Sequence, residues 1–312
     1  MKRPETTQEK LDGYEKERLA LQKEKSKAMP WLILWPIIIF FATLVLTQSE
    51  VIVIPATIIA AIISSFIYKS SIGNDFDGLK SKVRKTLIKE FMTTYHPKTV
   101  YNYYPTIQKV REIVKRSKLI RGVDDYDEED IITGSHNGAY FYFSEIHLQQ
   151  EDEDSTTTLF KGILFKIKLP NRKFPNSKIQ SRRGLFSKIF GNFYHNEEFD
   201  VYINSEDPQV LEEEIRPLLP FISHLSKKQG DLRISTHGDE ITIMMKSNMQ
   251  FLDDPKQRVD ETFLKEQYRD NVGRQLNTLL FIVDSFINNS DTSEIEERLE
   301  LKTMMEVRRP NV

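Results

Sequence analysis

The sequence contains no cysteine among its 312 residues. Disulfides, thiolate metal sites, iron–sulfur clusters and cysteine nucleophiles are therefore excluded. It also lacks the GxGxxG and GxxxxGK[ST] patterns of nucleotide-binding loops and the HExxH pattern of zinc proteases. No repeat of solenoid or propeller length is present. We therefore expect no cofactor and no metal. His136 and His237 each lie close to a turn glycine, and we expect both in exposed turns.

The chain also lacks an excess of either charge. Lysine and arginine number 44, aspartate and glutamate 46, and the formal net charge is -2. A slightly acidic chain does not favour nucleic-acid binding, so we expect no nucleic-acid partner. Because neither charge dominates the whole chain, a charged binding surface would have to come from a local cluster of charged residues.

Two long apolar runs are present, at 30–46 and 51–68, with only four residues between them. At 1.5 Å per helical residue, about 17 residues just cross a hydrocarbon core of roughly 30 Å. Pro36 and Pro55 predict kinks, which membrane helices tolerate. The sequence therefore predicts a transmembrane helical hairpin over 29–69.

Basic residues flank this hairpin on both sides, whereas the linking loop carries only Glu50 as a charged residue. The positive-inside rule then places both the N- and C-termini in the cytoplasm, in a multi-pass protein. The charged segment 1–28 is too long for the start of a cleaved signal peptide. It predicts a solvated helix or tail, with a coiled-coil contact to another subunit as an alternative.

The region 70–290 predicts a soluble α+β domain with a mostly antiparallel sheet and flanking helices, and the strand number allows a pleckstrin-homology-like barrel. A short C-terminal helix and tail are expected over 291–312. Apolar periodicity places the expected helices at 75–95, 106–117, 212–228 and 263–286. Alternation places the expected strands at 130–134, 139–148, 157–168, 199–203, 232–234 and 241–245.

Acidic residues provide the candidate chemistry. The run 124–130 could bind a divalent cation through carboxylates, but charge runs usually form solvated loops, and we expect a loop. Ser144 and Glu145 are expected to be a structural polar pair at a strand end. The enzymatic alternative is an unrecognised carboxylate or metal site that uses Asp127, Glu129, Asp130 or Glu145.

The segment 171–193 has six basic residues and no acidic one, with phenylalanines between them. Basic charge beside exposed aromatic rings suits an anionic membrane surface, where each nearby cation contributes about 1 kcal/mol. The alternative is a packing loop with solvated cations. The candidate residues for contact with lipid or a partner are Arg172, Lys173, Lys178, Arg182, Arg183, Lys188, Phe186 and Phe190.

Four short motifs occur in order: Glu129–Gly134, Phe141–Glu145, Phe160–Phe165 and Phe199–Tyr202. In these motifs, and in having a membrane hairpin ahead of them, the chain resembles the bacterial family called domain of unknown function 3137. The resemblance covers about 101–286. It implies a bacterial inner-membrane protein without an assigned activity, and it carries over no catalytic residue.

Together these features predict a membrane-anchored cytoplasmic interaction module that binds a protein partner or an anionic lipid surface at the bilayer. The alternative function is a membrane-tethered hydrolase built on the carboxylates named above. Gly134 and Gly162 are expected at positions where the backbone conformation requires glycine. An oligomeric membrane component formed by the hairpin itself is a weaker third reading.

Overall fold

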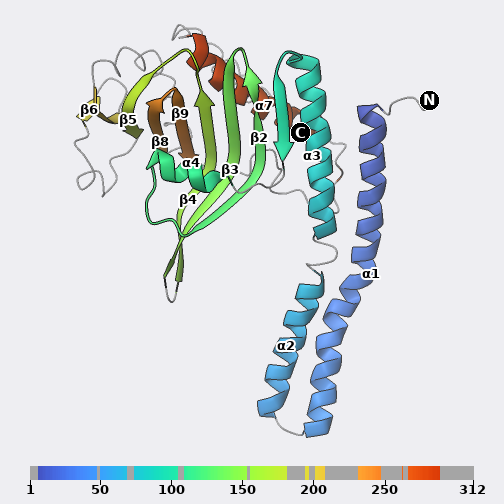
Figure 1. Cartoon of the computed structure of the whole chain (residues 1–312). Coiled ribbons are helices and arrows are strands. Elements are labelled where there is room, and N and C mark those ends of the chain that lie inside the picture. The colour runs from blue at the N-terminus through green and yellow to red at the C-terminus, as the bar shows by residue number, and fades with distance from the viewer. Residues whose placement is uncertain are drawn as a thin grey trace. The chain divides into compact units, whose positions relative to one another are not determined.

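The computed structural model describes the chain over the ranges 6–47, 50–68, 74–104, 109–152, 155–180, 194–196, 201–207, 231–246, 262 and 266–288 (Figure 1). Two compact units divide the chain. Unit 1 comprises Met1–Thr94 and Asp253–Gly273, and unit 2 comprises Tyr95–Leu252 and Arg274–Val312. The expected helix at 212–228 and the short helix and tail over 291–312 lie outside the described residues.

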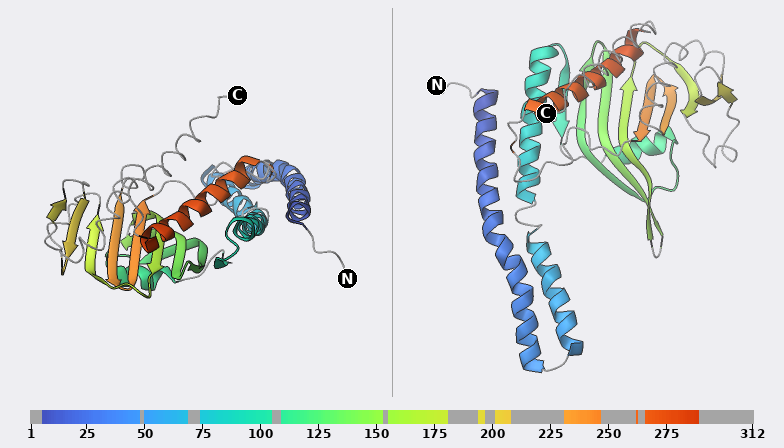
Figure 2. Two further views of the ribbon diagram at one scale, coloured as in Figure 1. Left: turned by 90° about the horizontal axis from the view of Figure 1, so that it is seen from above. Right: turned by 180° about the vertical axis from the view of Figure 1, so that it is seen from behind.

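Unit 1 begins with a single long helix. Helix α1 spans Thr7–Thr47 and continues through Pro30 and Pro36. Helix α2, Glu50–Tyr68, runs back alongside it (Figures 1 and 2). The charged N-terminal segment and the first apolar run therefore form one continuous helix.

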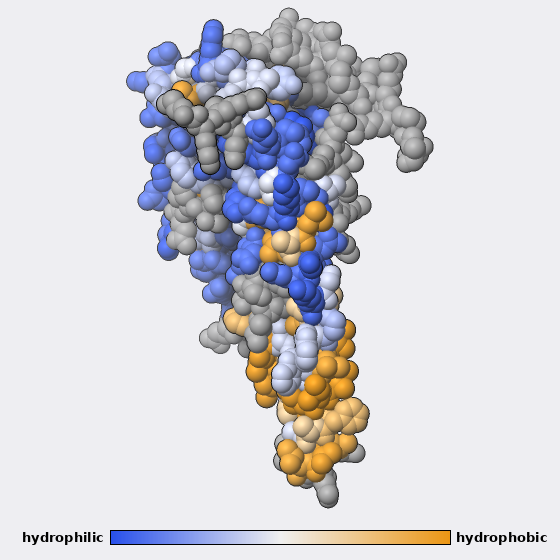
Figure 3. Space-filling view, turned by 90° about the vertical axis from the view of Figure 1, so that its right-hand side faces the viewer, coloured by the Kyte–Doolittle hydropathy of each residue, from blue (hydrophilic) through white to orange (hydrophobic). Residues whose placement is uncertain are grey.

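The apolar half of α1 is exposed. Ile33 is 64% and Val45 74% accessible, and Phe66 on α2 is 72% accessible. Figure 3 shows hydrophobic residues, in orange, gathered at the lower end of the view. Among the described helices, α1 is long and apolar enough to cross a membrane, whereas the apolar stretch Val53–Phe66 of α2 is shorter. An N-terminal apolar helix of this kind is compatible with membrane anchoring.

The polar half of α1 packs on helix α3, which spans Asn74–Tyr95. The Tyr14 hydroxyl lies 3.3 Å from that of Thr86, and Lys82 Nζ donates to Glu17 Oε2 at 3.0 Å. The later residue of α1, Glu17, pairs with the earlier residue of α3, Lys82, so the two helices are antiparallel. Leu11 is fully buried, so the helix that was expected to be solvated has a buried apolar position.

The expected helix at 75–95 is confirmed by α3. Its apolar positions recur every three or four residues and are buried. They are Phe76, Leu79, Val83, Leu87 and Phe91.

Unit 2 contains an antiparallel sheet of nine strands among the described residues, in the order β1-β2-β3-β4-β9-β8-β5-β7-β6. The expected α+β class with a large antiparallel sheet is confirmed. This single sheet does not confirm a pleckstrin-homology-like barrel, which remains a prediction. The strands are β1 Val100–Tyr104, β2 Asp125–His136, β3 Ala139–Asp152, β4 Ser155–Lys168, β5 Phe174–Gln180, β6 Tyr194–Asn196, β7 Val201–Ser205, β8 Leu232–Gly238 and β9 Glu240–Lys246.

Strands β2 and β3 are joined by a two-residue turn. Asn137 and Gly138 have φ values of 48° and 85°, the left-handed conformation that such hairpins require. This confirms the expected hairpin. Earlier in β2, Asp130 has a φ of 52° at a β-bulge.

The acidic run was expected to form a loop, and that expectation is wrong. It belongs to β2 from Asp125 onward and pairs with β3. Asp125 and Asp127 are exposed, whereas Glu128 and Asp130 are buried. The two buried carboxylates have hydrogen-bond partners, described below, and these make the strand possible.

Two helices lie on opposite faces of the sheet (Figure 2). One is α4, Val110–Ser117, and the other is the unit 2 part of α7, whose full span is Glu266–Asn288. α4 packs into an apolar cluster on its own face of the sheet. The cluster consists of Val110, Val114, Ile146, Leu148, Phe160, Leu164 and Met244.

Candidate functional site

The outer side of α4 and the turn after it carry a dense group of cations. Between positions 109 and 121 there are six basic residues and one acidic residue, Glu112, and all seven are exposed. We call these six the cationic face. They are Lys109, Arg111, Lys115, Arg116, Lys118 and Arg121.

The sequence of α4 explains why the cations lie outward. Val110 and Val114, four residues apart, are both 1% accessible and lie on the side of α4 that meets the sheet. The basic residues of α4, Arg111, Lys115 and Arg116, lie away from that side, and Lys109, Lys118 and Arg121 flank the helix and are also exposed. Because the apolar side is already covered, α4 has no free apolar face to insert into a bilayer, and its exposed side carries mainly charge.

A buried carboxylate from the sheet fixes the start of α4. Glu128 Oε2 accepts hydrogen bonds from the backbone N–H groups of Lys109 and Val110, at 3.1 and 3.2 Å. A carboxylate at this position satisfies free N–H groups and interacts favourably with the helix dipole. The Tyr142 hydroxyl donates to the other oxygen, Oε1. Burial, followed by the hydrogen bond and charge of Glu128, raises the pKa of Tyr142 well above its usual range.

Of the eight candidate contact residues, the structure describes three, and they do not form one surface. Arg172 Nη1 donates to the Phe286 carbonyl at 2.8 Å, and its guanidinium lies 5.9 Å from the centre of the Phe174 ring. Lys173 is exposed. Lys178 is partly buried, and this burial, followed by the charges of Arg121 and Lys118, lowers its pKa. The other five, Arg182, Arg183, Phe186, Lys188 and Phe190, lie outside the described residues.

The candidate carboxylates lie on the neighbouring strands β2 and β3. Asp130 Oδ1 accepts a hydrogen bond from the Tyr103 hydroxyl at 2.7 Å, and Asp127 is exposed on the same strand. Glu129 pairs in register with Glu145. No group of three histidine, aspartate or glutamate residues within the described part of the chain is arranged to hold a metal ion.

Ser144 and Glu145 lie in the interior of β3, which extends to Asp152, and not at a strand end as expected. Ser144 is fully buried. Alternation along the strand places it on the α4 face with Ile146, since neighbouring residues point to opposite faces. The pair is therefore part of the sheet and does not form an accessible nucleophile and base.

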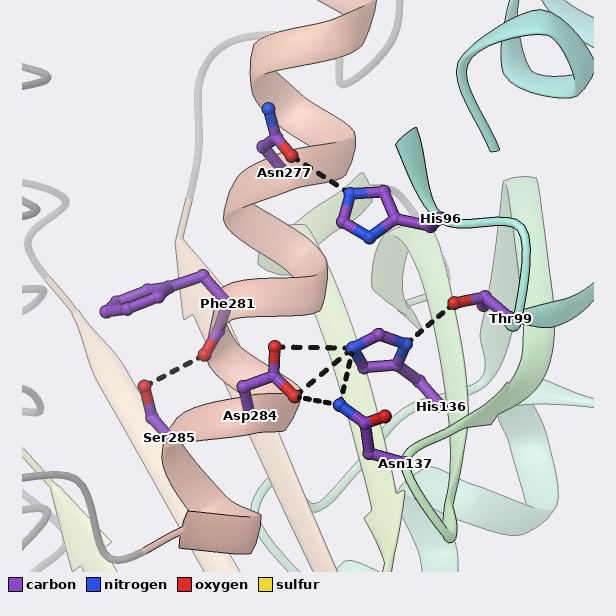
Figure 4. A network of polar contacts seen from close by, with 8 residues as sticks. All are labelled: His96, Thr99, His136, Asn137, Asn277, Phe281, Asp284 and Ser285. Atoms are coloured by element: carbon purple, nitrogen blue, oxygen red, sulfur yellow. Dashed lines mark hydrogen bonds and ion pairs between the residues drawn. The ribbon is translucent and has the colours of Figure 1, made fainter. Parts of the chain in front are cut away.

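His136 was expected in an exposed turn, and that expectation is wrong, because the residue is 9% accessible. It is the last residue of β2, and its ring lies beside α7, between Asp284 and Thr99 (Figure 4). Its Nδ1 is 2.6 Å from Thr99 Oγ1, and its Nε2 is 3.1 Å from Asp284 Oδ1. His237 is exposed near its turn, as expected.

The hydrogen bonds define the roles of the groups in this cluster. Nε2 faces a carboxylate, so in the neutral ring it carries the proton and Nδ1 accepts from the Thr99 hydroxyl. The Asn137 amide donates to Asp284 Oδ1 at 2.8 Å. His96 Nε2, at 3.1 Å from Asn277 Oδ1, adds a second contact to α7 (Figure 4).

A carboxylate, an imidazole and a hydroxyl in a row resemble a catalytic triad. Thr99, however, is 7% accessible, so its hydroxyl is closed to a substrate. We interpret the cluster as a polar clasp that fixes the second half of α7 to the β2–β3 hairpin. Sequence reasoning missed it because its partners lie on three segments far apart in the chain.

Comparisons with known proteins add little to this geometry. No family model matches the sequence, and no curated protein matches it. Among solved structures, the chain is similar to the crystal structure of the mycobacterial trehalose monomycolate transport factor A, TtfA, at 12% identity and a TM-score of 0.32. The match covers 64% of this chain and 94% of that one. A likeness at this score carries no functional argument.

Proposed function

We propose that this chain is a membrane-anchored interaction module that binds an anionic lipid surface through the cationic face around α4. The observation that carries the proposal is the exposed concentration of six cations on an element whose apolar side is already buried. At about 1 kcal/mol per cation near an anionic leaflet, three cations in contact give roughly a hundredfold in affinity.

In this proposal, α1 and α2 form a hairpin that crosses the inner membrane of a bacterium twice and leaves both termini in the cytoplasm. The mutual contact of the two helices and their exposed apolar side chains support it. Unit 2 then lies in the cytoplasm, where the inner leaflet of that membrane offers anionic lipids. The resemblance to domain of unknown function 3137 points to the same location.

The absence of cysteine allows a clean topology test by single-cysteine labelling. Lys27→Cys, Ser49→Cys and Lys161→Cys are each expressed in whole cells and treated with a membrane-impermeant maleimide. We expect Ser49→Cys to react in intact cells and the other two to react only after permeabilisation. Reaction of Lys161→Cys in intact cells would show that α1 crosses alone, and it would overturn the hairpin.

The lipid function is tested on the full-length protein in nanodiscs. A polarity-sensitive dye on Glu112→Cys, in the middle of the cationic face, reports contact with the bilayer. We expect its emission to shift to the blue when about one third of the lipid is anionic and to revert in about 1 M NaCl, where the Debye length is about 3 Å. The same emission in neutral and anionic discs would overturn lipid binding and make a protein partner the leading function.

Charge reversal supplies a matched control. Adding Lys109→Glu and Lys115→Glu to the dye-labelled protein should abolish the blue shift, because both residues lie on the cationic face. Lys98→Glu with Lys161→Glu changes the net charge by the same amount at exposed residues outside that face. This second pair should retain the shift. Equal losses in both pairs would show that overall charge, and not this face, controls the contact.

A further inference from the structure

A small polar cavity lies between α4 and strands β4, β8 and β9. Its volume is about 10 Å³, roughly the space that one water molecule or one monatomic ion needs. Lys166 of β4 pairs in register with Thr242 of β9, and Thr242 pairs with Ser235 of β8. Residues paired across strands point to the same face of a sheet, so these three side chains lie next to one another on the α4 face. Ile113 and Arg116 line the cavity from the side of α4.

One carboxylate in this cavity faces two cations. Glu240 Oε1 lies 2.8 Å from Lys166 Nζ, and Glu240 Oε2 lies 3.3 Å from Arg116 Nη1. The side chains of Glu240 and Lys166 are 13% and 21% accessible, so solvent screens their charges only weakly. Among the described residues that line the cavity, Glu240 alone is acidic, and His237 is neutral or positive. The lining therefore has at least one positive charge in excess.

The cavity is also rich in hydrogen-bond donors. A lysine ammonium and an arginine guanidinium have about eight N–H donors together, whereas one carboxylate offers about four acceptor positions. Ser235 and Thr242 are 7% and 6% accessible, and each hydroxyl can rotate to donate into the cavity. An occupant that is negatively charged and only accepts hydrogen bonds therefore suits this lining better than one that must also donate them.

We propose that this cavity binds a monatomic anion, of which chloride is the common example, between Lys166, Arg116 and the hydroxyls of Ser235 and Thr242. Such an ion offsets the excess positive charge, which a neutral water molecule does not. The two cations repel a metal ion, and a phosphate or carboxylate group is too large for a cavity of this volume. The site goes beyond the proposed lipid function, because its ligand is a soluble ion bound between α4 and the sheet.

The first experiment detects the ion directly. The chloride nuclear magnetic resonance linewidth is measured with the full-length protein in neutral phosphatidylcholine nanodiscs, and empty discs supply the blank. We expect extra broadening that saturates with chloride and that bromide reverses, whereas sulfate at equal ionic strength does not, because it is too large. No saturable broadening, or equal reversal by bromide and sulfate, would overturn the site.

Thermal unfolding provides an independent measurement. A ligand that binds the folded chain raises its Tm as the ligand concentration rises. We expect the Tm of the full-length protein to rise as sodium chloride replaces sodium gluconate at constant ionic strength, and the Tm of Lys166→Met to stay constant. A rise of the same size in both proteins would be a general salt effect and would overturn the site.

A matched lysine controls for overall charge. Lys166→Met should weaken chloride binding at least about tenfold, because it removes the less accessible of the two cations. Lys168 lies two residues further along β4, with its Nζ 3.4 Å from Asp239, and does not line the cavity. Lys168→Met should therefore retain chloride binding. An equal loss in the two variants would show that net charge, and not this cavity, attracts the ion.

Two further variants change the lining without removing a cation. Thr242→Val keeps the shape of the side chain and removes its hydroxyl, so it should weaken chloride binding. Glu240→Gln removes the one negative charge of the lining and should strengthen chloride binding. Unchanged binding in Thr242→Val, or weaker binding in Glu240→Gln, would overturn the site. All these measurements use neutral discs, so their results do not depend on the proposed binding of anionic lipid.

Discussion

Asp284 of α7 and His136 at the end of β2 lie 3.1 Å apart, although 148 positions separate them in the chain. Asp284 also accepts a hydrogen bond from the side-chain amide of Asn137, so one carboxylate accepts hydrogen bonds from two residues of the β2–β3 hairpin. Asp284→Ala should therefore lower the free energy of unfolding by about 1–3 kcal/mol, because these donors lose their acceptor. Denaturant unfolding followed by near-ultraviolet circular dichroism measures it. Asp127→Ala, at an exposed position, should change stability by less than about 0.5 kcal/mol.

Gly134 has no room for a side chain. A Cβ atom there would lie 2.1 Å from the Val100 carbonyl oxygen and 2.7 Å from Phe141 Cζ. Gly134→Ala should cost more than about 2 kcal/mol, because strand β1 would have to move. Gly13→Ala is the opposite case, since nothing lies within 4 Å of its Cβ position. It should stabilise α1 by about 0.5–1 kcal/mol. A tolerated Gly134→Ala in thermal unfolding would contradict the close packing of β1 on β2.

Tyr142 keeps its proton at a pH where an ordinary tyrosine, with a pKa of 10.0, loses it. The folded chain then holds a proton that the unfolded chain releases, so this residue's contribution to stability falls as the pH rises above about 10. Tyr142→Phe should lower the free energy of unfolding by about 1 kcal/mol at neutral pH, because Glu128 loses a hydrogen-bond donor. Above pH 10 the stability of this variant should fall less with rising pH than that of the wild type. Unfolding curves at several alkaline pH values measure the difference. Tyr140→Phe, at a residue that is 58% accessible, should follow the wild type throughout.

Lys178 is expected to lower stability. Its pKa lies below its ordinary value of 10.5, so the folded state disfavours the charged form. Lys178→Met should raise Tm by about 2 °C at neutral pH. The advantage should shrink as the pH rises through the folded pKa toward 10.5, because both states then lose the proton. A lower Tm in Lys178→Met at neutral pH would show that the charge contributes to the fold instead of opposing it.

Local patterns predicted much of the fold. The three- and four-residue spacing of Phe76, Leu79 and Val83 predicted α3, and the Asn137-Gly138 pair predicted the β2–β3 hairpin. These features depend on residues close in sequence, where backbone preferences and side-chain periodicity determine the result.

The site depends on contacts that sequence spacing does not encode. The charge run predicts a loop that includes Glu128, because no neighbouring residue indicates that its carboxylate reaches the start of α4, 18 positions away. The sequence groups Lys178 with the basic residues of 171–193, whereas its pKa is lowered by burial and then by the charges of Arg121 and Lys118 of the α4 turn. The excess of basic over acidic residues in 109–121 could have indicated the cationic face. Hydrophobic periodicity predicts the helix there but gives no weight to its charge.

The strand order has a consequence for synthesis on the ribosome. Strands β2, β3 and β4 follow one another in the chain and in the sheet, so they can pair as soon as they emerge. The free side of β4, however, pairs with β9, and Lys168 meets Glu240 only after about 70 further residues have been made. At about 5–20 residues per second this takes roughly 4–14 seconds. Throughout that interval the β9 side of β4 is an open strand edge, which another chain with unpaired strands could pair with.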